Sequence, residues 1–158
     1  PYVKNNRIEG IPRNWKAWLS NHCKAEIIAL PSCRSPIFQR SKENTVSIKI
    51  SGDKGPHPII SAYSSPAENI TFILQEIKGT MRNISNEKAL VGVDLKAHNR
   101  RWGYSTDDNR GITTEEFIEF NHFNTSDAEP FSRGNSIGWP DLTMTQGASL
   151  ANKNIWEV

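Results

Sequence analysis

The segment from Ala89 to Gly103 constrains the fold more than any other part of the chain. Residues 89–93 form a short apolar run that predicts a buried strand, and Asp94 follows at its carboxyl end. In α/β sheets, ligands and reactive groups gather at the carboxyl ends of strands. A backbone held in a sheet also fixes a carboxylate more accurately than a mobile loop can. Asp94 is therefore the first candidate for a functional residue.

Composition places the chain among ordinary globular proteins. Its 158 residues are enough for one domain with a hydrophobic core. Hydrophobic residues make up 36% and charged residues 23%, and the net charge of +2 is too small to indicate nucleic-acid binding by itself. Two cysteines are too few for a disulfide framework, so we expect a reducing, intracellular compartment, although a bridge between them stays open. The sequence contains no apolar run near the ~20 residues of a membrane span and no signal peptide.

Three segments in the first half of the chain have the pattern of antiparallel strands. They are residues 25–30, 44–50 and 59–63. The middle segment alternates between apolar and polar residues, which is typical of a strand with one buried face. A loop with Gly and Pro before the third segment marks a turn. The strand positions expected to be buried across the whole chain are Val46, Ile48, Ile50, Ile60, Leu90, Val91, Val93, Leu142 and Met144.

Two helices are predicted in the second half of the chain. A capping box of Ser65 and Glu68 predicts the start of the first, and a capping box of Thr113 and Glu116 predicts the start of the second. A further strand is expected over residues 139–145. This order of elements favours a layered α/β or α+β architecture. The first helix carries an apolar stripe that should face the sheet, formed by Ile70, Ile73, Ile77 and Met81.

Five segments share their order and spacing with one known family. They are Tyr2, residues 60–66 (Ile-Ser-Ala-Tyr-Ser-Ser-Pro), residues 91–103 with Ala-His and Trp-Gly inside them, residues 110–118, and residues 139–143 (Trp-Pro-Asp-Leu-Thr). One aspartate after a strand would be weak evidence, but five such pieces in one order are specific. The chain thereby resembles the endonuclease/exonuclease/phosphatase superfamily, and within it the apurinic-endonuclease-like domain of non-long-terminal-repeat retrotransposons.

The resemblance implies a fold and a cofactor. The fold is α/β (α+β), a four-layer sandwich of two facing mixed β-sheets flanked by helices. We expect one domain over residues 1–158 that is incomplete at both ends, because the family's metal-ligating glutamate would precede Pro1 and its catalytic histidine would follow Val158. Family members hydrolyse phosphate esters with a divalent metal, usually Mg²⁺, so Mg²⁺ is the implied cofactor. Its ligands in this chain are unknown.

The resemblance also implies roles for individual residues. Asp94 matches the carboxylate that orients or deprotonates the attacking water, and Tyr63 matches the tyrosine whose hydroxyl lies at the phosphate. Asp141 matches the aspartate that orients the catalytic histidine. His98 matches a histidine of the retrotransposon branch to which no role is assigned. On the residues alone, Asp94 is more typical of a turn cap than of a catalytic carboxylate, and Tyr63 is more typical of an ordinary strand aromatic.

Lys96 departs from the family, which carries asparagine at this position. An ammonium group donates hydrogen bonds and accepts none, so Lys96 would repel a metal ion and could form a salt bridge with Asp94. Lys96, Arg100 and Arg101 together form a small cationic cluster. Such a cluster suits a nucleic-acid backbone, but it is also typical of solvated surface.

Three functions remain open. The first is a metal-dependent endonuclease that nicks target DNA for a retrotransposon. The alternative, which Lys96 favours, is a catalytically inactive remnant that binds nucleic acid weakly at most. The third is a phosphomonoesterase acting on a phosphoinositide or a similar substrate, which the Ala-His and Trp-Gly pairs of residues 97–103 disfavour. The implied partners are DNA and a reverse-transcriptase domain in the same polypeptide, with a nuclear location and no membrane.

Overall fold

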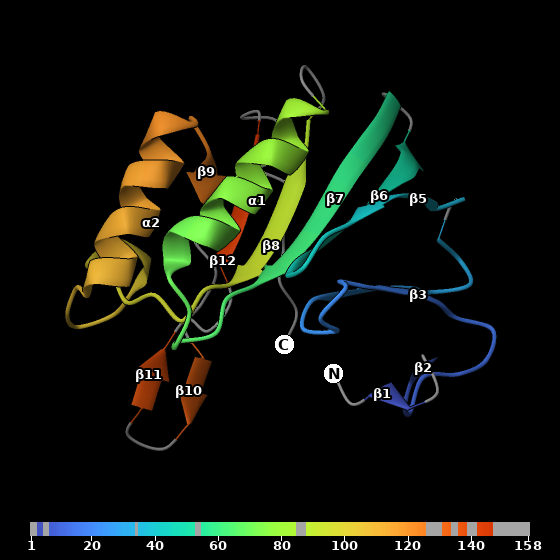
Figure 1. Ribbon diagram of the computed structural model, residues 1–158, viewed down its shortest axis with the longest axis horizontal. Helices are drawn as coiled ribbons and strands as arrows, with labels where there is room; N and C mark the ends of the chain where they lie inside the picture. Colours follow the sequence, from blue (N-terminus) through green and yellow to red (C-terminus); the bar gives the residue numbers. More distant parts are fainter. Residues whose placement is uncertain are drawn as a thin grey trace.

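The centre of the molecule is a six-stranded mixed sheet with the strand order β5-β6-β7-β8-β12-β9 (Figure 1). The computed structural model describes residues 3–4, 7–33, 35–52, 55–84, 88–125, 131–133, 136–138 and 142–146. The sheet consists of β5 (Ile37–Ser41), β6 (Thr45–Gly52), β7 (Gly55–Tyr63), β8 (Leu90–Asp94), β9 (Asn124–Thr125) and β12 (Leu142–Thr145).

The remaining strands form three antiparallel pairs. These pairs are β1 (Val3–Lys4) with β2 (Arg7–Ile8), β3 (Lys16–Leu19) with β4 (Glu26–Ala29), and β10 (Phe131–Arg133) with β11 (Ser136–Gly138). The helices are α1 (Ile70–Arg82), α2 (Asn109–Phe120) and a short 3₁₀ turn, Arg100–Trp102.

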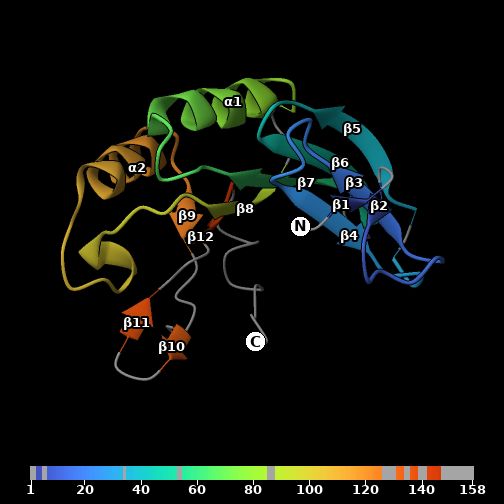
Figure 2. The same cartoon turned by 60° about the horizontal axis from the view of Figure 1, so that its bottom comes forward.

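The elements lie in layers, as Figure 2 shows. Helices α1 and α2 cover one face of the six-stranded sheet, and the β3–β4 pair lies against the other face, where it contacts β6 and β7. The predicted sandwich of two facing sheets with helices outside is confirmed. In the described part of the chain, the layers are the β3–β4 pair, the large sheet and the helix pair.

The pairing of β7 with β8 decides which residues meet at the edge of the sheet. Strands β6 and β7 pair antiparallel as predicted, but the first strand of the predicted meander, β4, pairs with β3, and its place beside β6 is taken by β5. Strand β8 runs parallel to β7. Parallel neighbours need a long crossover, and α1 supplies it. The register places Tyr63 directly beside Asp94, each as the last residue of its strand. Strand β12 runs antiparallel to β8 and pairs Leu142 with Val93, so it begins at the same edge.

The hydrophobic core follows the predicted positions closely. Residues of β7, β8, β12 and α1 form one buried cluster between the sheet and the helices, and Met81 packs against it at half burial. Strand β6 is buried on both faces, because polar Thr45 and Ser47 are as inaccessible as Val46. The expectation of a single buried face was wrong here, since the sheet is covered from both sides. Two predicted core residues, Ile50 and Leu90, are only half-buried. The expected core positions that are fully buried are Val46, Ile48, Ile60, Val91, Val93, Leu142, Met144, Ile70, Ile73 and Ile77.

Both predicted helix starts were wrong. Helix α1 begins after Asn69, whose side chain accepts a hydrogen bond from the Thr71 amide at 3.0 Å. The segment from Ser65 to Glu68 forms a turn instead, because the Glu68 amide donates to the Ser65 carbonyl and the Glu68 carboxylate pairs with Lys24.

Helix α2 begins four residues before the predicted capping box. Asp108 is its N-cap and accepts a 2.6 Å hydrogen bond from the Gly111 amide. The hydroxyl of Thr113 donates to the Asn109 carbonyl inside the helix, so it does not cap the helix end.

Gly111→Ala should destabilise the fold, whereas Gly79→Ala should not. A Cβ at Gly111 would collide with the His98 carbonyl group, which is backbone and cannot move aside cheaply. A Cβ at Gly79 would approach the mobile end of the Lys42 side chain at 3.0 Å. Urea unfolding should show a loss of about 2 kcal/mol or more for Gly111→Ala, and a change between zero and a gain of about 1 kcal/mol for Gly79→Ala. Equal effects of the two substitutions would contradict the close packing at the start of α2.

Candidate functional site

A cavity of about 430 Å³ lies beside the paired ends of β7 and β8. Tyr63 and Asp94 both line it, and the ladder between the strands continues one step further, where the Ser64 amide donates to the Asp94 carbonyl at 2.9 Å. A Cβ at Gly92 would meet nothing within 4 Å, so the sheet leaves the space above it open. The residues around the cavity are Lys24, Ala25, Glu26, Ser61, Ala62, Tyr63, Gly92, Val93, Asp94 and Thr143.

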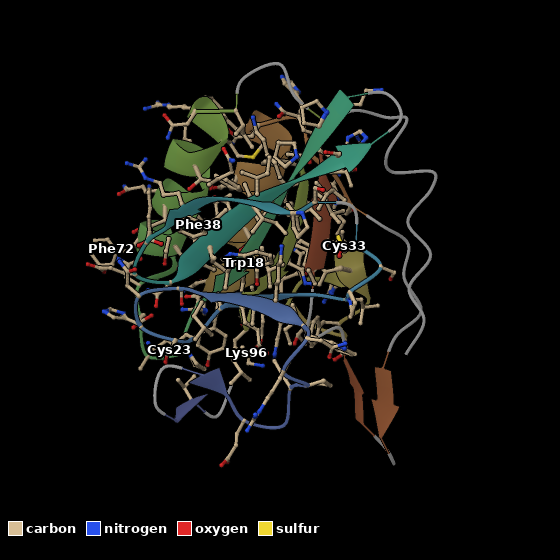
Figure 3. The ribbon with its side chains drawn as sticks, turned by 90° about the vertical axis from the view of Figure 1, so that its right-hand side faces the viewer. Trp18, Cys23, Cys33, Phe38, Phe72 and Lys96 are labelled. Carbon is tan, nitrogen blue, oxygen red and sulfur yellow. The ribbon has the colours of Figure 1, made fainter. Side chains whose placement is uncertain are left out.

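Lys96 is bound to the central carboxylate of this site. Its Nζ lies 2.7 Å from Oδ2 of Asp94, and the two side chains are 40% and 22% exposed. In the view of Figure 3, Lys96 appears just below the β3–β4 pair, at about the height of Cys23 in the turn between those strands. The salt bridge that the sequence suggested is therefore present in the structure.

The backbone at Lys96 has a φ of 48°, in the left-handed region. This region is strained for residues with a Cβ, and asparagine enters it far more readily than lysine. The backbone conformation at position 96 therefore suits asparagine, the residue that the resemblance implies here, although the side chain present is a cation.

Three buried oxygens in the wall of the cavity have no hydrogen-bond partner among the described residues. They are Oδ1 of Asp94, Oε2 of Glu26 and Oγ1 of Thr143. Oxygen donors of this kind suit Mg²⁺. However, no group of three His, Cys, Asp or Glu side chains in the described ranges is placed to hold a metal ion, and the Lys96 ammonium binds the other oxygen of Asp94. As they stand, the described residues do not form a magnesium site.

His98 lies outside the cavity. It is exposed and stacks on Tyr104, with the ring centroids 4.2 Å apart. Its Nδ1 lies 4.0 Å from a carboxylate oxygen of Asp108. The structure therefore places His98 in the loop that packs on the start of α2, and its role in catalysis stays a prediction.

Arg100 and Arg101 are both engaged with acidic side chains. Arg100 Nε donates to the Ser105 carbonyl and lies 3.8 Å from Asp107. Arg101 pairs with Glu119 at 2.8 Å and, more loosely, with Glu115. Among the described residues lining the cavity, neither arginine occurs. The assignment of Arg100 and Arg101 to nucleic-acid binding stays a prediction.

The remaining candidate, Asp141, lies outside the described residues, and its role also stays a prediction.

Sequence reasoning missed an ion pair at the rim of the cavity. Lys24 Nζ lies 2.8 Å from Glu68 Oε1, which ties the turn between β3 and β4 to the loop after β7. The hydrogen bond from Lys24 holds the pKa of the Glu68 carboxyl below its ordinary value. The two residues are 44 positions apart and lie in loops, so no local pattern could have paired them.

With this geometry established, the comparisons with known proteins identify the family. Residues 58–158 match the endonuclease–reverse transcriptase family, and the chain belongs to it. Among solved structures, the chain is similar to the endonuclease domain of TRAS1, a telomere-specific non-LTR retrotransposon. The TM-score is 0.75 at 21% identity, and the match covers 87% of this chain and 69% of that one. At this identity the likeness shows the fold.

No curated protein matches the sequence. None of the helices in the described part of the chain is long and apolar enough to cross a membrane. The resemblance inferred from the five sequence segments is thus confirmed by the family match and by the solved structure.

Lys96→Asn should leave the protein more stable than Lys96→Ala. Both substitutions remove the ion pair with Asp94, but only asparagine is favoured at a φ of 48°. We expect the asparagine variant to be more stable by about 0.5–1 kcal/mol, as measured by urea unfolding. Arg100→Asn and Arg100→Ala, at the start of the 3₁₀ turn where the backbone is not left-handed, serve as the matched pair. A more stable alanine variant at position 96 would contradict the backbone argument.

Proposed function

We propose that this chain is the DNA-nicking endonuclease domain of a non-LTR retrotransposon polypeptide, in a form restrained by Lys96. The observation that carries the proposal is the register that sets Tyr63 beside Asp94 at one cavity, in a member of the endonuclease–reverse transcriptase family. The proposed substrate is a DNA phosphodiester, and the proposed partner is a reverse-transcriptase domain of the same polypeptide.

In the proposed reaction, a water molecule attacks the phosphorus atom. A new P–O bond forms, one P–O bond to a sugar oxygen breaks, and the sugar oxygen leaves as a hydroxyl after taking up a proton from solvent water, while the proton held by Asp94 returns to solvent. Asp94 orients the water and accepts its proton, because one carboxylate oxygen is buried without a partner beside the cavity. The Tyr63 hydroxyl donates a hydrogen bond to the phosphate from the neighbouring strand. Such donors stabilise the charge that develops in the transition state.

Magnesium dependence belongs to the proposal as well. The metal would neutralise phosphate charge. Lys24 lines the cavity and Lys96 lies beside it, but each of these two cations is already paired with a carboxylate. The Lys96 ammonium opposes metal binding at Asp94. At ~4 Å and an effective dielectric constant near 20, each unit of charge on the ion meets roughly 4 kcal/mol of repulsion. We therefore expect metal binding to require that Lys96 leave Asp94.

A second function is supported by the same ion pair. The 2.7 Å contact between Lys96 and Asp94 occupies the proposed general base. If the contact persists when DNA is present, the chain is a catalytically inactive remnant of the domain that binds nucleic acid weakly at most. The two functions predict different rates of DNA nicking after Lys96 is replaced.

Plasmid nicking tests both functions. We expect the natural chain to nick supercoiled plasmid very poorly with Mg²⁺. In a polypeptide that also carries the family's glutamate and histidine, Lys96→Asn should raise the rate by at least about tenfold, because it frees the carboxylate that would accept the proton, a group of the kind worth 10²–10⁴ in rate. Asp94→Ala in the Lys96→Asn background should abolish nicking.

Lys78→Asn is the matched control, since Lys78 lies over the Phe120 ring on the helix side of the sheet, away from the cavity. It should leave the rate unchanged. No nicking by the Lys96→Asn variant would favour the remnant, and strong nicking by the natural chain that Asp94→Ala abolishes would show that Lys96 is no restraint.

A further inference from the structure

We propose that Arg110 is a positioning residue that holds the ends of β7 and β8 together, so that Tyr63 and Asp94 keep their relative placement. The proposal rests on the proposed function for its catalytic consequence, but its geometry is independent of it. Arg110 belongs to one of the segments that carry the family resemblance, which implies no role for it.

The guanidinium group of Arg110 makes four hydrogen bonds to the two loops that follow the site residues. Nη1 donates to the Glu68 carbonyl at 2.6 Å, and Nη2 donates to the Ser64 hydroxyl at 2.8 Å. Nη2 and Nε both donate to the Leu95 carbonyl, at 2.7 and 3.2 Å. Ser64 directly follows Tyr63, and Leu95 directly follows Asp94. One planar side chain thus bridges the two positions next to the site residues.

The side chain of Arg110 bridges the two segments just beyond the point where the backbone hydrogen bonds between β7 and β8 end. The last backbone hydrogen bond of the β7–β8 ladder joins the Ser64 amide to the Asp94 carbonyl. Beyond it the chain turns into two separate loops, and Ser64 and Leu95 are nonetheless 1% and 3% exposed. Buried carbonyl and hydroxyl groups in such loops need donors. Arginine suits this task because its five donors have a fixed geometry and its charge is permanent.

The bridge also supports the strained residue that follows. Lys96 comes directly after Leu95 and has the left-handed φ of 48°. Strained backbone persists where its surroundings over-determine it. The double hydrogen bond to the Leu95 carbonyl fixes the peptide before Lys96, and with it the direction from which the Lys96 side chain reaches Asp94.

Arg110 is itself held in place by the start of α2. The Asp108 carboxylate accepts hydrogen bonds from the amides of Gly111 and His98, and the Asp108 amide donates to the His98 carbonyl. Gly111 allows this approach because a side chain there would collide with His98. The helix start is therefore fixed on the loop after β8, and Arg110 reaches from it to the loop after β7.

The test compares Arg110→Gln and Arg110→Lys with Arg82→Gln, which changes an exposed arginine in the last turn of α1. The full chain is labelled with 3-fluorotyrosine, and ¹⁹F spectra report Tyr63 and Tyr104 separately. Arg110→Gln should shift or broaden the Tyr63 signal and leave Tyr104, which stacks on His98 beside α2, in place. Hydrogen exchange of the Ser64 amide should accelerate at least tenfold, with the amides of Val91 and Val93 within twofold of the natural chain.

Arg110→Lys should give intermediate effects, because it keeps the charge and loses the planar set of donors. In the Lys96→Asn background, Arg110→Gln should lower kcat at least tenfold with KM within twofold. A shifted ¹⁹F signal of Tyr104 with an unchanged signal of Tyr63 would show that Arg110 is a general stabiliser and overturn the proposal. Equal acceleration of hydrogen exchange at the Ser64 amide and at the core amides would do the same. If Lys96→Asn does not nick at all, the proposed function fails, and the fluorine and exchange measurements still decide the role of Arg110.

Discussion

The parallel pairing of β7 with β8 is the constraint on which the rest of the site depends. Helix α1 carries the chain back to the end of the sheet where β7 begins, so β7 and β8 run in the same direction and end at one edge. Their register sets Tyr63 beside Asp94. The buried apolar face of β7, β8 and α1 fixes that register, since a slip by one residue would turn Ile60, Val91 and Val93 away from the helices. Tyr63 and Asp94 therefore lie side by side at one cavity as a consequence of core packing, and loop contacts such as those of Arg110 refine their placement.

One residue of the site, Lys96, departs from the pattern that the family resemblance implies. The backbone at position 96 keeps a conformation that suits asparagine, yet the side chain is an ammonium that binds the central carboxylate. The cavity at the same time keeps three buried oxygens that lack partners among the described residues. The site thus combines oxygen donors that suit a cation with an ammonium group that binds Asp94, and the two proposed functions differ in whether this ion pair opens.

Much of this could be predicted from the sequence, and the remainder could not for physical reasons. Asp94 was found because strand, carboxylate and turn are adjacent in the chain, and Tyr63 was found through the family resemblance. The helix starts were misplaced because Ser65 and Glu68 have the spacing of a capping box, while Glu68 is drawn instead to Lys24. Arg110 and Lys24 act across long sequence separations, where no periodicity carries a signal. The burial of both faces of β6 depends on the β3–β4 pair, which the pattern of β6 alone does not reveal.

The central claim is that Lys96 controls access of a cation to Asp94. Paramagnetic broadening by Mn²⁺ measures this directly, in ¹H–¹⁵N spectra of the natural chain and of Lys96→Asn, because broadening falls steeply with distance from the bound ion. We expect low concentrations of Mn²⁺ to broaden the amide signals of Tyr63, Asp94 and Leu95 in Lys96→Asn and to leave them sharp in the natural chain. Equal broadening of these signals in both proteins would contradict it.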